Sequence, residues 1–303
     1  GISGDNAGGI LKRIDTDVFA HQPTWAIIMI GMNDVRRSLY QKVRQNEPGI
    51  REKQEQALQT YYTYVDSIVR LLIKSGSKVV LQTPSIYDQT SLFETENNFG
   101  VNDALKKCAG FLKSLSQKYH LPVVDYWDVL NRVNEIIHKK DMQATIIGRD
   151  RVHPGVEGHF IMASEFLKMQ NAPKYVSELT LNVRRQRIVR MQNCTVSNIK
   201  YKKGEISFQS LEASLPYPLL SPDFNPDSLI RFTDQFNNEI LQVESLKKGN
   251  YDVWVDSARI GNYAEKELQQ NAASAFDKLY KTNKPVSHHY SIIRKIKETA
   301  DRE

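Results

Sequence analysis

This sequence contains little cysteine and no long hydrophobic run. Its two cysteines among 303 residues, Cys108 and Cys194, fall in regions that we expect to form different domains. Two distant thiols indicate neither a disulfide framework nor a cysteine-based metal site. No apolar stretch approaches the roughly 20 residues that a helix needs to cross a bilayer, so we expect no membrane span.

An excess of one charge is also missing. The chain has 41 Lys and Arg against 35 Asp and Glu, and the formal net charge of +6 is spread along it rather than gathered in blocks. The densest basic run, Arg184 to Arg190, is typical of a solvated strand or linker face, with an anionic-ligand or polysaccharide surface as the alternative. This distribution gives no reason to expect a nucleic-acid partner.

Several common catalytic signatures are absent as well. The sequence has no G-x-S-x-G nucleophile elbow, and no H-E-x-x-H motif or cysteine cluster that would hold zinc. We therefore expect neither a metal nor another cofactor. No signal-peptide pattern is visible, and the chain begins with Gly1 rather than Met.

The first 172 residues alternate strand patterns with helix patterns. A continuous apolar run at Trp25–Ile30 predicts a strand buried on both faces, and Lys78–Leu81 predicts the next strand. The spacing of apolar residues over 57–73 predicts a long amphipathic helix. Such alternation predicts a parallel sheet covered by helices, and so an α/β domain over residues 1–172. Polar stretches at about 36–54 and 86–102 follow strand ends, so we expect them to flank the mouth of a site.

The pattern changes after residue 172. Leu179, Leu181 and Val183 alternate with polar residues, and turn signals separate this run from similar ones further on. We expect a small β-rich accessory domain over residues 173–263. Residues 264–303 have a helical pattern, and we expect a C-terminal helical segment there that would be available as a lid.

Two polar motifs follow hydrophobic elements of the first domain: Gly31-Met32-Asn33-Asp34 and Asp150-Arg151-Val152-His153-Pro154. In open α/β proteins, sites form at the carboxyl ends of the strands. We therefore expect the two motifs to contribute to one site.

The residue types in these motifs suit acyl transfer. His153 is the candidate general base, because an imidazole takes and returns a proton near neutral pH. Asp150, three residues earlier, would orient that ring and stabilise the imidazolium. Asn33 offers a neutral amide donor for a developing oxyanion. The alternative is that Asp150 is a capping residue, His153 a surface histidine and Asn33 a turn residue.

Together with Gly1-Ile2-Ser3-Gly4-Asp5-Asn6 at the start, these motifs resemble the SGNH (GDSL-type) serine hydrolases. The resemblance implies a flavodoxin-like, three-layer α/β/α fold, a Ser-His-Asp mechanism acting on carboxylic esters, and a periplasmic or secreted location. It also implies that the amide of Gly4 joins Asn33 in an oxyanion hole, with His153 as base and Asp150 as its orienter.

The second half adds a weaker resemblance. Asn182 to Arg190 and Gly249 to Asp256 look like the C-terminal region of long bacterial GDSL-type esterases, which are often associated with polysaccharide degradation. The resemblance implies a short acyl ester, such as acetyl, on a small molecule or a glycan. Four aromatic residues could form a sugar-stacking surface, although packing in a β core is the stronger interpretation; they are Tyr217, Phe224, Tyr251 and Trp254.

The nucleophilic serine of that family has no counterpart in this chain. Gly4-Asp5-Asn6 resembles a Gly-Asp-Ser motif with Asn in place of Ser, but only one helix and one strand fit between it and Asn33, as between the family's second and third motifs. We therefore expect a chain that starts after its nucleophile. Such a chain would be inactive and poorly soluble, with Trp25–Ile30 as an exposed edge strand.

Two rival classes stay open. One is a lipid-directed esterase or thioesterase, against which no long apolar lid segment is evident. The other is a non-catalytic carbohydrate-binding or scaffold protein that kept the fold and lost the serine. The oligomeric state is not indicated by any feature of the sequence.

Overall fold

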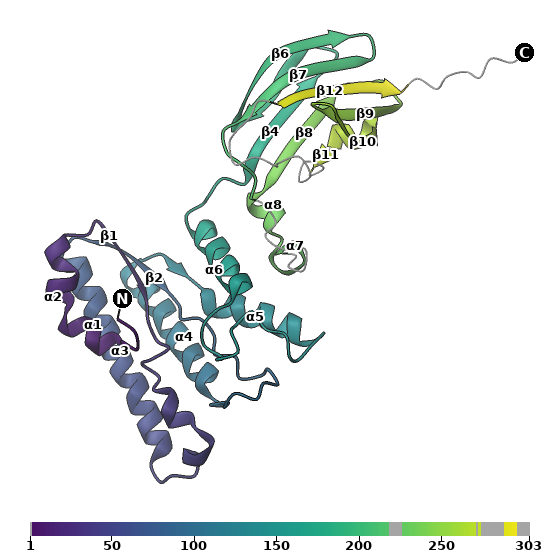
Figure 1. Cartoon of the computed structure of the whole chain (residues 1–303). Coiled ribbons are helices and arrows are strands. Elements are labelled where there is room, and N and C mark those ends of the chain that lie inside the picture. Colours follow the sequence, from purple (N-terminus) through teal and green to yellow (C-terminus); the bar gives the residue numbers. More distant parts are fainter. Residues whose placement is uncertain (1, 218–225, 271, 274–287, 296–303) are drawn as a thin grey trace, which may run out of the picture. The chain divides into compact units, whose positions relative to one another are not determined.

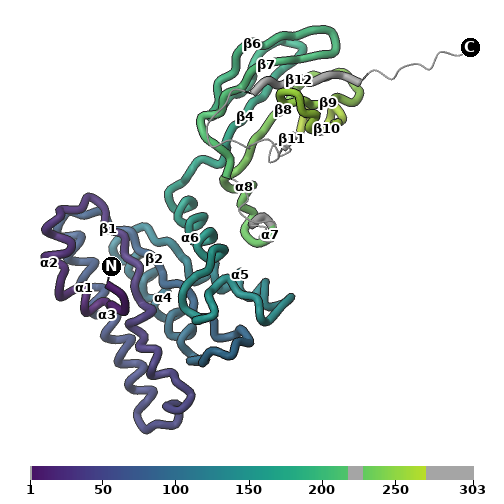
Figure 2. The backbone as a smooth tube through the Cα atoms, in the orientation of Figure 1, coloured from purple at the N-terminus to yellow at the C-terminus, as the bar shows by residue number. Residues whose placement is uncertain are grey.

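The computed structural model describes residues 2–217, 226–270, 272–273 and 288–295. The chain divides into two compact units, Gly1–Asn171 and Ala172–Glu303 (Figure 1). Figure 2 follows the backbone through the helical first unit and into the strands of the second.

The first unit is built around a parallel sheet of three strands in the order β1-β2-β3, which confirms the predicted α/β class. The strands are β1 (Trp25–Met29), β2 (Lys78–Gln82) and β3 (Val123–Val124). The helices are α1 (Ala7–Lys12), α2 (Ile14–Asp17), α3 (Ile50–Lys74), α4 (Val101–Tyr119), α5 (Tyr126–His138) and α6 (Val156–Met169). Short 3-10 turns complete the unit at η1 (Phe19–His21), η2 (Arg37–Tyr40) and η3 (Lys42–Arg44).

The core of this unit lies between the central strand and the long helices. Three successive residues of β2, from Val79 to Leu81, are buried, so this strand is covered on both faces. α3 and α4 both contact β2 and turn apolar stripes inward, with Val65 and Leu105 fully buried. Burial of each such side chain contributes roughly 1.5–3 kcal/mol. Each helix begins after a polar connection, so those connections lie at the carboxyl ends of the strands.

β1 forms one edge of the sheet. Successive side chains alternate between the two faces of a strand. Trp25, Ile27 and Met29 therefore share one face, and their exposed fractions are 56%, 52% and 46%, whereas Ile28 on the other face is 8% exposed. The prediction that this run is buried on both faces is wrong for β1, because no element of the described chain covers that face. The edge position agrees with the expectation, also made from the sequence, that Trp25–Ile30 is an exposed edge strand.

The second unit consists of two sheets. One has five strands in the order β10-β9-β12-β7-β6, and the other has four in the order β11-β8-β4-β5. The strands are β4 (Tyr175–Asn182), β5 (Arg187–Gln192), β6 (Cys194–Lys202), β7 (Glu205–Glu212), β8 (Asn238–Glu244), β9 (Asn250–Val255), β10 (Ala258–Ala264), β11 (Ala272–Ala273) and β12 (His288–Lys295). The helices are α7 (Pro226–Ile230), α8 (Phe232–Phe236) and α9 (Glu265–Gln270).

The core of the second unit draws on both sheets. Leu181 of β4 and Val243 of β8 pack in one cluster with Phe208 of β7 and Val255 of β9, and all four are buried. Two sheets joined by such a cluster make a sandwich. Tyr251 belongs to the same cluster, so core packing explains this aromatic residue better than sugar stacking does.

The other aromatic candidates fall into different settings. Tyr217 packs edge-on against Phe232, and Trp254 is half-buried on the face of β9 opposite to Tyr251. Phe224 lies outside the described residues.

The helical pattern expected over residues 264–303 is only partly present. α9 covers Glu265–Gln270, but residues 288–295 form β12, and the helical prediction is wrong there. β12 pairs with β7 on one side and β9 on the other, so its backbone hydrogen bonds are satisfied by long-range partners. Residues 274–287 and 296–303, which the same prediction covered, lie outside the described residues.

The sequence also led to expectations about membrane spans, metal sites and cysteines. Among the described residues, no helix is long and apolar enough to cross a membrane. No group of histidine, cysteine and carboxylate side chains there has the arrangement of a metal site. Cys108 and Cys194 are free and buried.

The edge strand leads to a paired test. Ile27→Thr alters an exposed side chain, so we expect the free energy of unfolding to change by less than about 0.5 kcal/mol and the soluble yield to rise. Ile28→Thr places a hydroxyl on the buried face of the same strand and should lower the free energy of unfolding by about 2 kcal/mol. Urea unfolding and the soluble fraction measure both. Equal destabilisation by the two changes would contradict the exposed face.

Candidate active site

A sharp turn follows β1 and carries Asn33. Gly31 has a φ of +145°, and a Cβ there would lie 3.3 Å from Pro84, so glycine is required at the turn. The next residues project Asn33 toward the N-terminal segment, where its Nδ2 donates to the carbonyl of Asp5 at 2.8 Å. The following carboxylate, that of Asp34, is buried and accepts from the amide of Ala7 at 2.8 Å. The turn is therefore tied twice to the N-terminal segment, once at Asp5 and once at the first residue of α1.

That segment presents the backbone of Gly4. Ser3 and Gly4 form a turn in which the amide of Asp5 donates to the carbonyl of Ile2 at 3.2 Å, and the φ of Gly4 is +74°. Gly4 is exposed, and its amide donates no hydrogen bond within the described residues. Asn6 does not occupy the place of a nucleophilic serine. Its side chain caps α1 instead, by accepting a hydrogen bond from the amide of Gly9. Asn33 and Gly4 thus lie on two segments in direct contact.

Asp150 and His153 form a close pair on the loop before α6. Nδ1 of His153 lies 2.5 Å from Oδ2 of Asp150. The other carboxylate oxygen accepts from the amides of Val152 and His153 at 2.9 and 3.0 Å. An ionised carboxylate only accepts, so Nδ1 carries the proton and Nε2 is the basic nitrogen. The imidazole is 81% exposed, which leaves Nε2 accessible.

The same contacts set the charge of Asp150. Burial raises the pKa of this carboxyl, but the hydrogen bonds from the His153 ring and from the two amides outweigh it and lower the pKa to about 2. The carboxylate is therefore ionised at neutral pH and stabilises an imidazolium at His153.

Arg151, between the two, holds the loop in place. It is 2% exposed and has a φ of +66°, a left-handed conformation that is unfavourable for a residue with a Cβ. Its guanidinium donates to the carbonyls of Asp88, Ser91, Phe93 and Thr95 at 2.9 to 3.3 Å. These bonds fasten the loop before α6 to the connection after β2. The sequence analysis missed this role, and the only signal was the position of Arg151 inside the motif.

A second Ser, His and Asp cluster joins Asp88 and Ser91 of that connection to His138 at the end of α5. Oγ of Ser91 donates to Asp88 and lies 3.0 Å from Nε2 of His138, and Thr145 also donates to Asp88. Burial raises the pKa of Asp88, but the hydrogen bonds from Ser91 and Thr145 outweigh it and lower the pKa. Asp88 therefore orients the serine rather than the histidine. Ser91 is 3% exposed, so this cluster is structural and does not supply a nucleophile.

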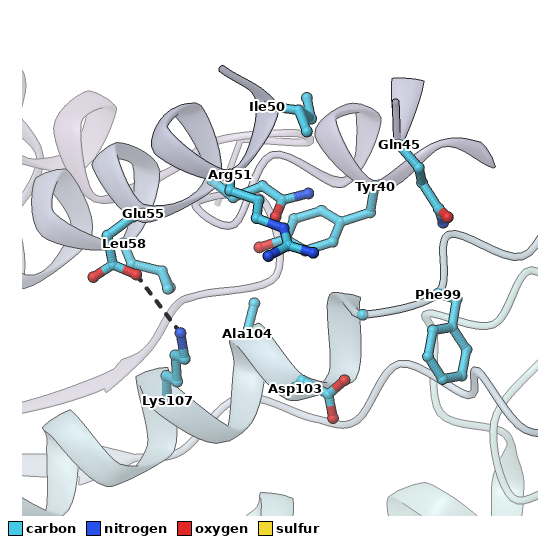
Figure 3. A pocket seen from close by; sticks show the side chains of 12 residues that line it. Tyr40, Gln45, Ile50, Arg51, Glu55, Leu58, Phe99, Asp103, Ala104 and Lys107 are labelled. Atoms are coloured by element: carbon cyan, nitrogen blue, oxygen red, sulfur yellow. Dashed lines mark ion pairs between the residues drawn. The ribbon is translucent and has the colours of Figure 1, made fainter. Parts of the chain in front are cut away.

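The two polar stretches expected at the mouth of the site meet around a hollow of about 470 Å³. Arg51 and Glu55 of α3 face Asp103 and Lys107 of α4 across it (Figure 3), and Nζ of Lys107 lies 3.6 Å from Oε2 of Glu55. Tyr40 also lines the hollow, and burial raises its pKa to about 12, so its phenol is a stable donor. None of the four predicted site residues lines this hollow.

The structure thus brings the predicted residues together in two pairs. Asn33 meets the Gly4–Asp5 segment, and Asp150 meets His153. Within the described residues, no hydrogen bond joins one pair to the other, and none joins a serine to His153.

A model of the GDSL-like Lipase/Acylhydrolase family matches residues 1–166, and the chain belongs to this family. It is 30% identical over 171 residues to an acetylxylan esterase of Geobacillus stearothermophilus, across 55% of this chain and 68% of that protein. It is also similar to the solved structure of a gut microbial diltiazem-metabolizing enzyme, with 28% identity and a TM-score of 0.75 over 91% of this chain. The chain spans 64% of the length of that structure.

The buried guanidinium gives a matched pair of variants. Arg151→Ala leaves several loop carbonyls without a donor and should lower the free energy of unfolding by about 3 kcal/mol. Arg149→Ala removes a neighbouring guanidinium that lies over the same Phe93 ring but is exposed, and should cost less than about 0.5 kcal/mol. Urea unfolding measures both changes. Equal effects would mean that the carbonyl contacts of Arg151 do not stabilise the fold.

The lowered pKa of Asp150 makes stability depend on pH. Because the pKa falls from 3.8 to about 2 on folding, the stabilisation is complete above about pH 4 and is lost as the pH falls toward 2. We expect the stability difference between the parent and Asp150→Asn to be constant above pH 5 and to shrink over that window. Unfolding curves at a series of pH values test this, with Asp141→Asn in an exposed turn as the control. A difference that stays constant down to pH 2 would contradict the assignment.

Proposed function

We propose that this chain forms most of a serine-type esterase that removes short acyl groups, acetyl above all, from a small molecule or a glycan. The observation that carries the proposal is the pair of Asp150 and His153. In this pair an ionised carboxylate accepts a hydrogen bond from Nδ1 of the imidazole, and Nε2 is accessible, as a general base for a serine requires.

In this mechanism a serine hydroxyl attacks the acyl carbonyl while Nε2 of His153 takes its proton. The tetrahedral intermediate collapses, the bond to the alcohol breaks, and His153 returns the proton to that alcohol. Water then repeats the sequence on the acyl-enzyme and releases the carboxylic acid. Asp150 stabilises the imidazolium in both halves and is not itself protonated.

Asn33 and Gly4 are the proposed oxyanion donors. An amide NH₂ group has two donor hydrogens, and Nδ2 of Asn33 uses one on the carbonyl of Asp5, which fixes its direction and leaves the other free. The amide of Gly4, one residue from that carbonyl, also has no acceptor within the described residues. Two fixed donors on adjoining segments suit a developing negative charge.

The nucleophile is proposed to come from a segment outside these 303 residues. The free edge of β1 supports this, because its exposed face, with Trp25, Ile27 and Met29, suits an additional strand and helix. Oδ2 of Asp34, at the turn after β1, is buried without a donor in the described chain, as expected if a neighbour there is missing. A strand added at this edge in parallel would end beside Asn33.

The substrate class is proposed from the relatives. One is named an acetylxylan esterase, which favours acetyl groups on a polysaccharide, and another is named for metabolising diltiazem, which favours a site that also admits small molecules. The described site needs no metal or cofactor for this chemistry.

The test is to express the 303-residue chain and, separately, the same reading frame with the codons that precede Gly1. Acetate release from acetylated xylan and from p-nitrophenyl acetate is the readout. We expect no turnover from the 303-residue chain and esterase activity from the longer one. In the longer protein, His153→Ala should lower kcat by about 10³-fold or more, and Asn33→Ala by about 10²-fold.

His159→Ala is the matched control, because His159 is an exposed histidine of the same motif that needs no catalytic role. Its kcat should stay within about twofold of the parent. An active 303-residue chain would contradict the external nucleophile. A longer protein without activity, or with activity that survives His153→Ala, would overturn the esterase assignment and favour a non-catalytic carbohydrate-binding role.

A further inference from the structure

A hollow of about 760 Å³ opens at one end of the β-sandwich unit. It is bordered by the β4–β5, β6–β7 and β8–β9 connections, and we call it the basic hollow. β4 starts near the beginning of the unit and reaches the hollow only at its far end, after Asn182. The basic hollow therefore lies at the end of the sandwich opposite to Tyr175, where the unit begins.

Four cationic side chains line the basic hollow. Arg184 comes from the first connection, Lys202 from the end of β6, Lys203 from the second connection and Lys247 from the third. All four are exposed, and none has an ion-pair partner among the described residues. Glu205 is the one carboxylate in the lining. Like charges gathered from three separate connections repel one another, so this end of the sandwich carries a positive potential that an anionic ligand would relieve.

Apolar side chains lie between these cations. Val183 and Leu246 are half-buried at the start of their connections, and Ile206 and Tyr251 are buried members of the core. The phenol of Tyr251 donates to the carbonyl of Lys247 at 2.7 Å, which fixes both the ring and the connection. The lining therefore combines an apolar floor with exposed cationic side chains.

This combination selects the chemistry of the ligand. A uronic acid ring has apolar C–H faces and one carboxylate, so a chain of such rings would pack on the floor and repeat its charges along the lysines. Single-stranded nucleic acid needs exposed aromatic rings for base stacking, and the aromatic ring of this lining, Tyr251, is buried in the core.

We propose that the basic hollow binds an acidic glycan, a chain of uronic acid residues, and so anchors the protein to the polymer. The choice of a glycan over other polyanions rests on the proposed esterase function, but the binding itself does not require catalysis. Arg184 belongs to the basic run for which the sequence analysis favoured a solvated face and kept an anionic-ligand or polysaccharide surface as the alternative, and the proposal takes up that alternative for this residue.

The test is calorimetric titration of the full chain with hexagalacturonate at low salt. The triple variant Lys202→Gln, Lys203→Gln, Lys247→Gln should weaken binding about tenfold or more, as expected from losing three exposed charge pairs. The matched control Lys174→Gln, Lys200→Gln, Lys266→Gln removes three exposed lysines of the same unit outside the hollow. Its Kd should stay within about twofold of the parent.

Several outcomes would overturn the proposal: no binding of hexagalacturonate, equal loss in the two triple variants, or equal affinity for neutral xylohexaose. Tighter binding of a heparin fragment or of a thymidine oligonucleotide would reassign the hollow to sulfated or nucleic-acid ligands. Binding is measured without turnover, so binding by the 303-residue chain leaves this inference standing even if the longer protein shows no esterase activity and the esterase proposal fails.

Discussion

The guanidinium of Arg151 joins two loops that are 56 to 63 residues apart in the sequence. Its charge is buried among carbonyl dipoles rather than paired with a carboxylate, and those bonds offset both the desolvation of the charge and a left-handed backbone. Because Arg151 lies between Asp150 and His153, the contacts that fix its side chain also fix the turn that presents the pair proposed as catalytic. The buried cluster around Asp88 and His138 supports the other side of the same junction.

The second constraint is the free edge of β1. The strand ends at the turn that carries Asn33 and Asp34, so the edge and the proposed oxyanion donors are parts of one structure. A sheet that exposes Trp25, Ile27 and Met29 loses the hydrophobic stabilisation that their burial would give. An element that covered this apolar face would also stand beside the proposed oxyanion hole.

Patterns among neighbouring residues in the sequence predicted the features that depend on interactions between residues close together in the chain. The alternation of apolar runs and helical stripes predicted the parallel sheet, and the spacing of Asp150 and His153 predicted a contact that a tight turn makes. The rest depends on partners far away in the sequence. β12 was predicted as helix because its strand state is set by β7 and β9, and Arg151 was overlooked because its partners are backbone carbonyls, which every residue has. The basic hollow could not be predicted, since three separate connections form it.

The place of β12 has a consequence for biosynthesis. β12 pairs with β7 and with β9, so the last described strand of the chain stands in the middle of its sheet rather than at its edge. During translation β7 and β9 emerge with the backbone groups that face one another still unpaired, and they stay so until residues 288–295 leave the ribosome. Pairing between strands that are far apart in the sequence makes folding slow, and until it is complete the nascent chain exposes unpaired strand edges that promote aggregation. The sandwich unit therefore completes its folding only once residues 288–295 have been synthesised, whereas the three described strands of the first unit pair in sequence order and are free to pair earlier in translation.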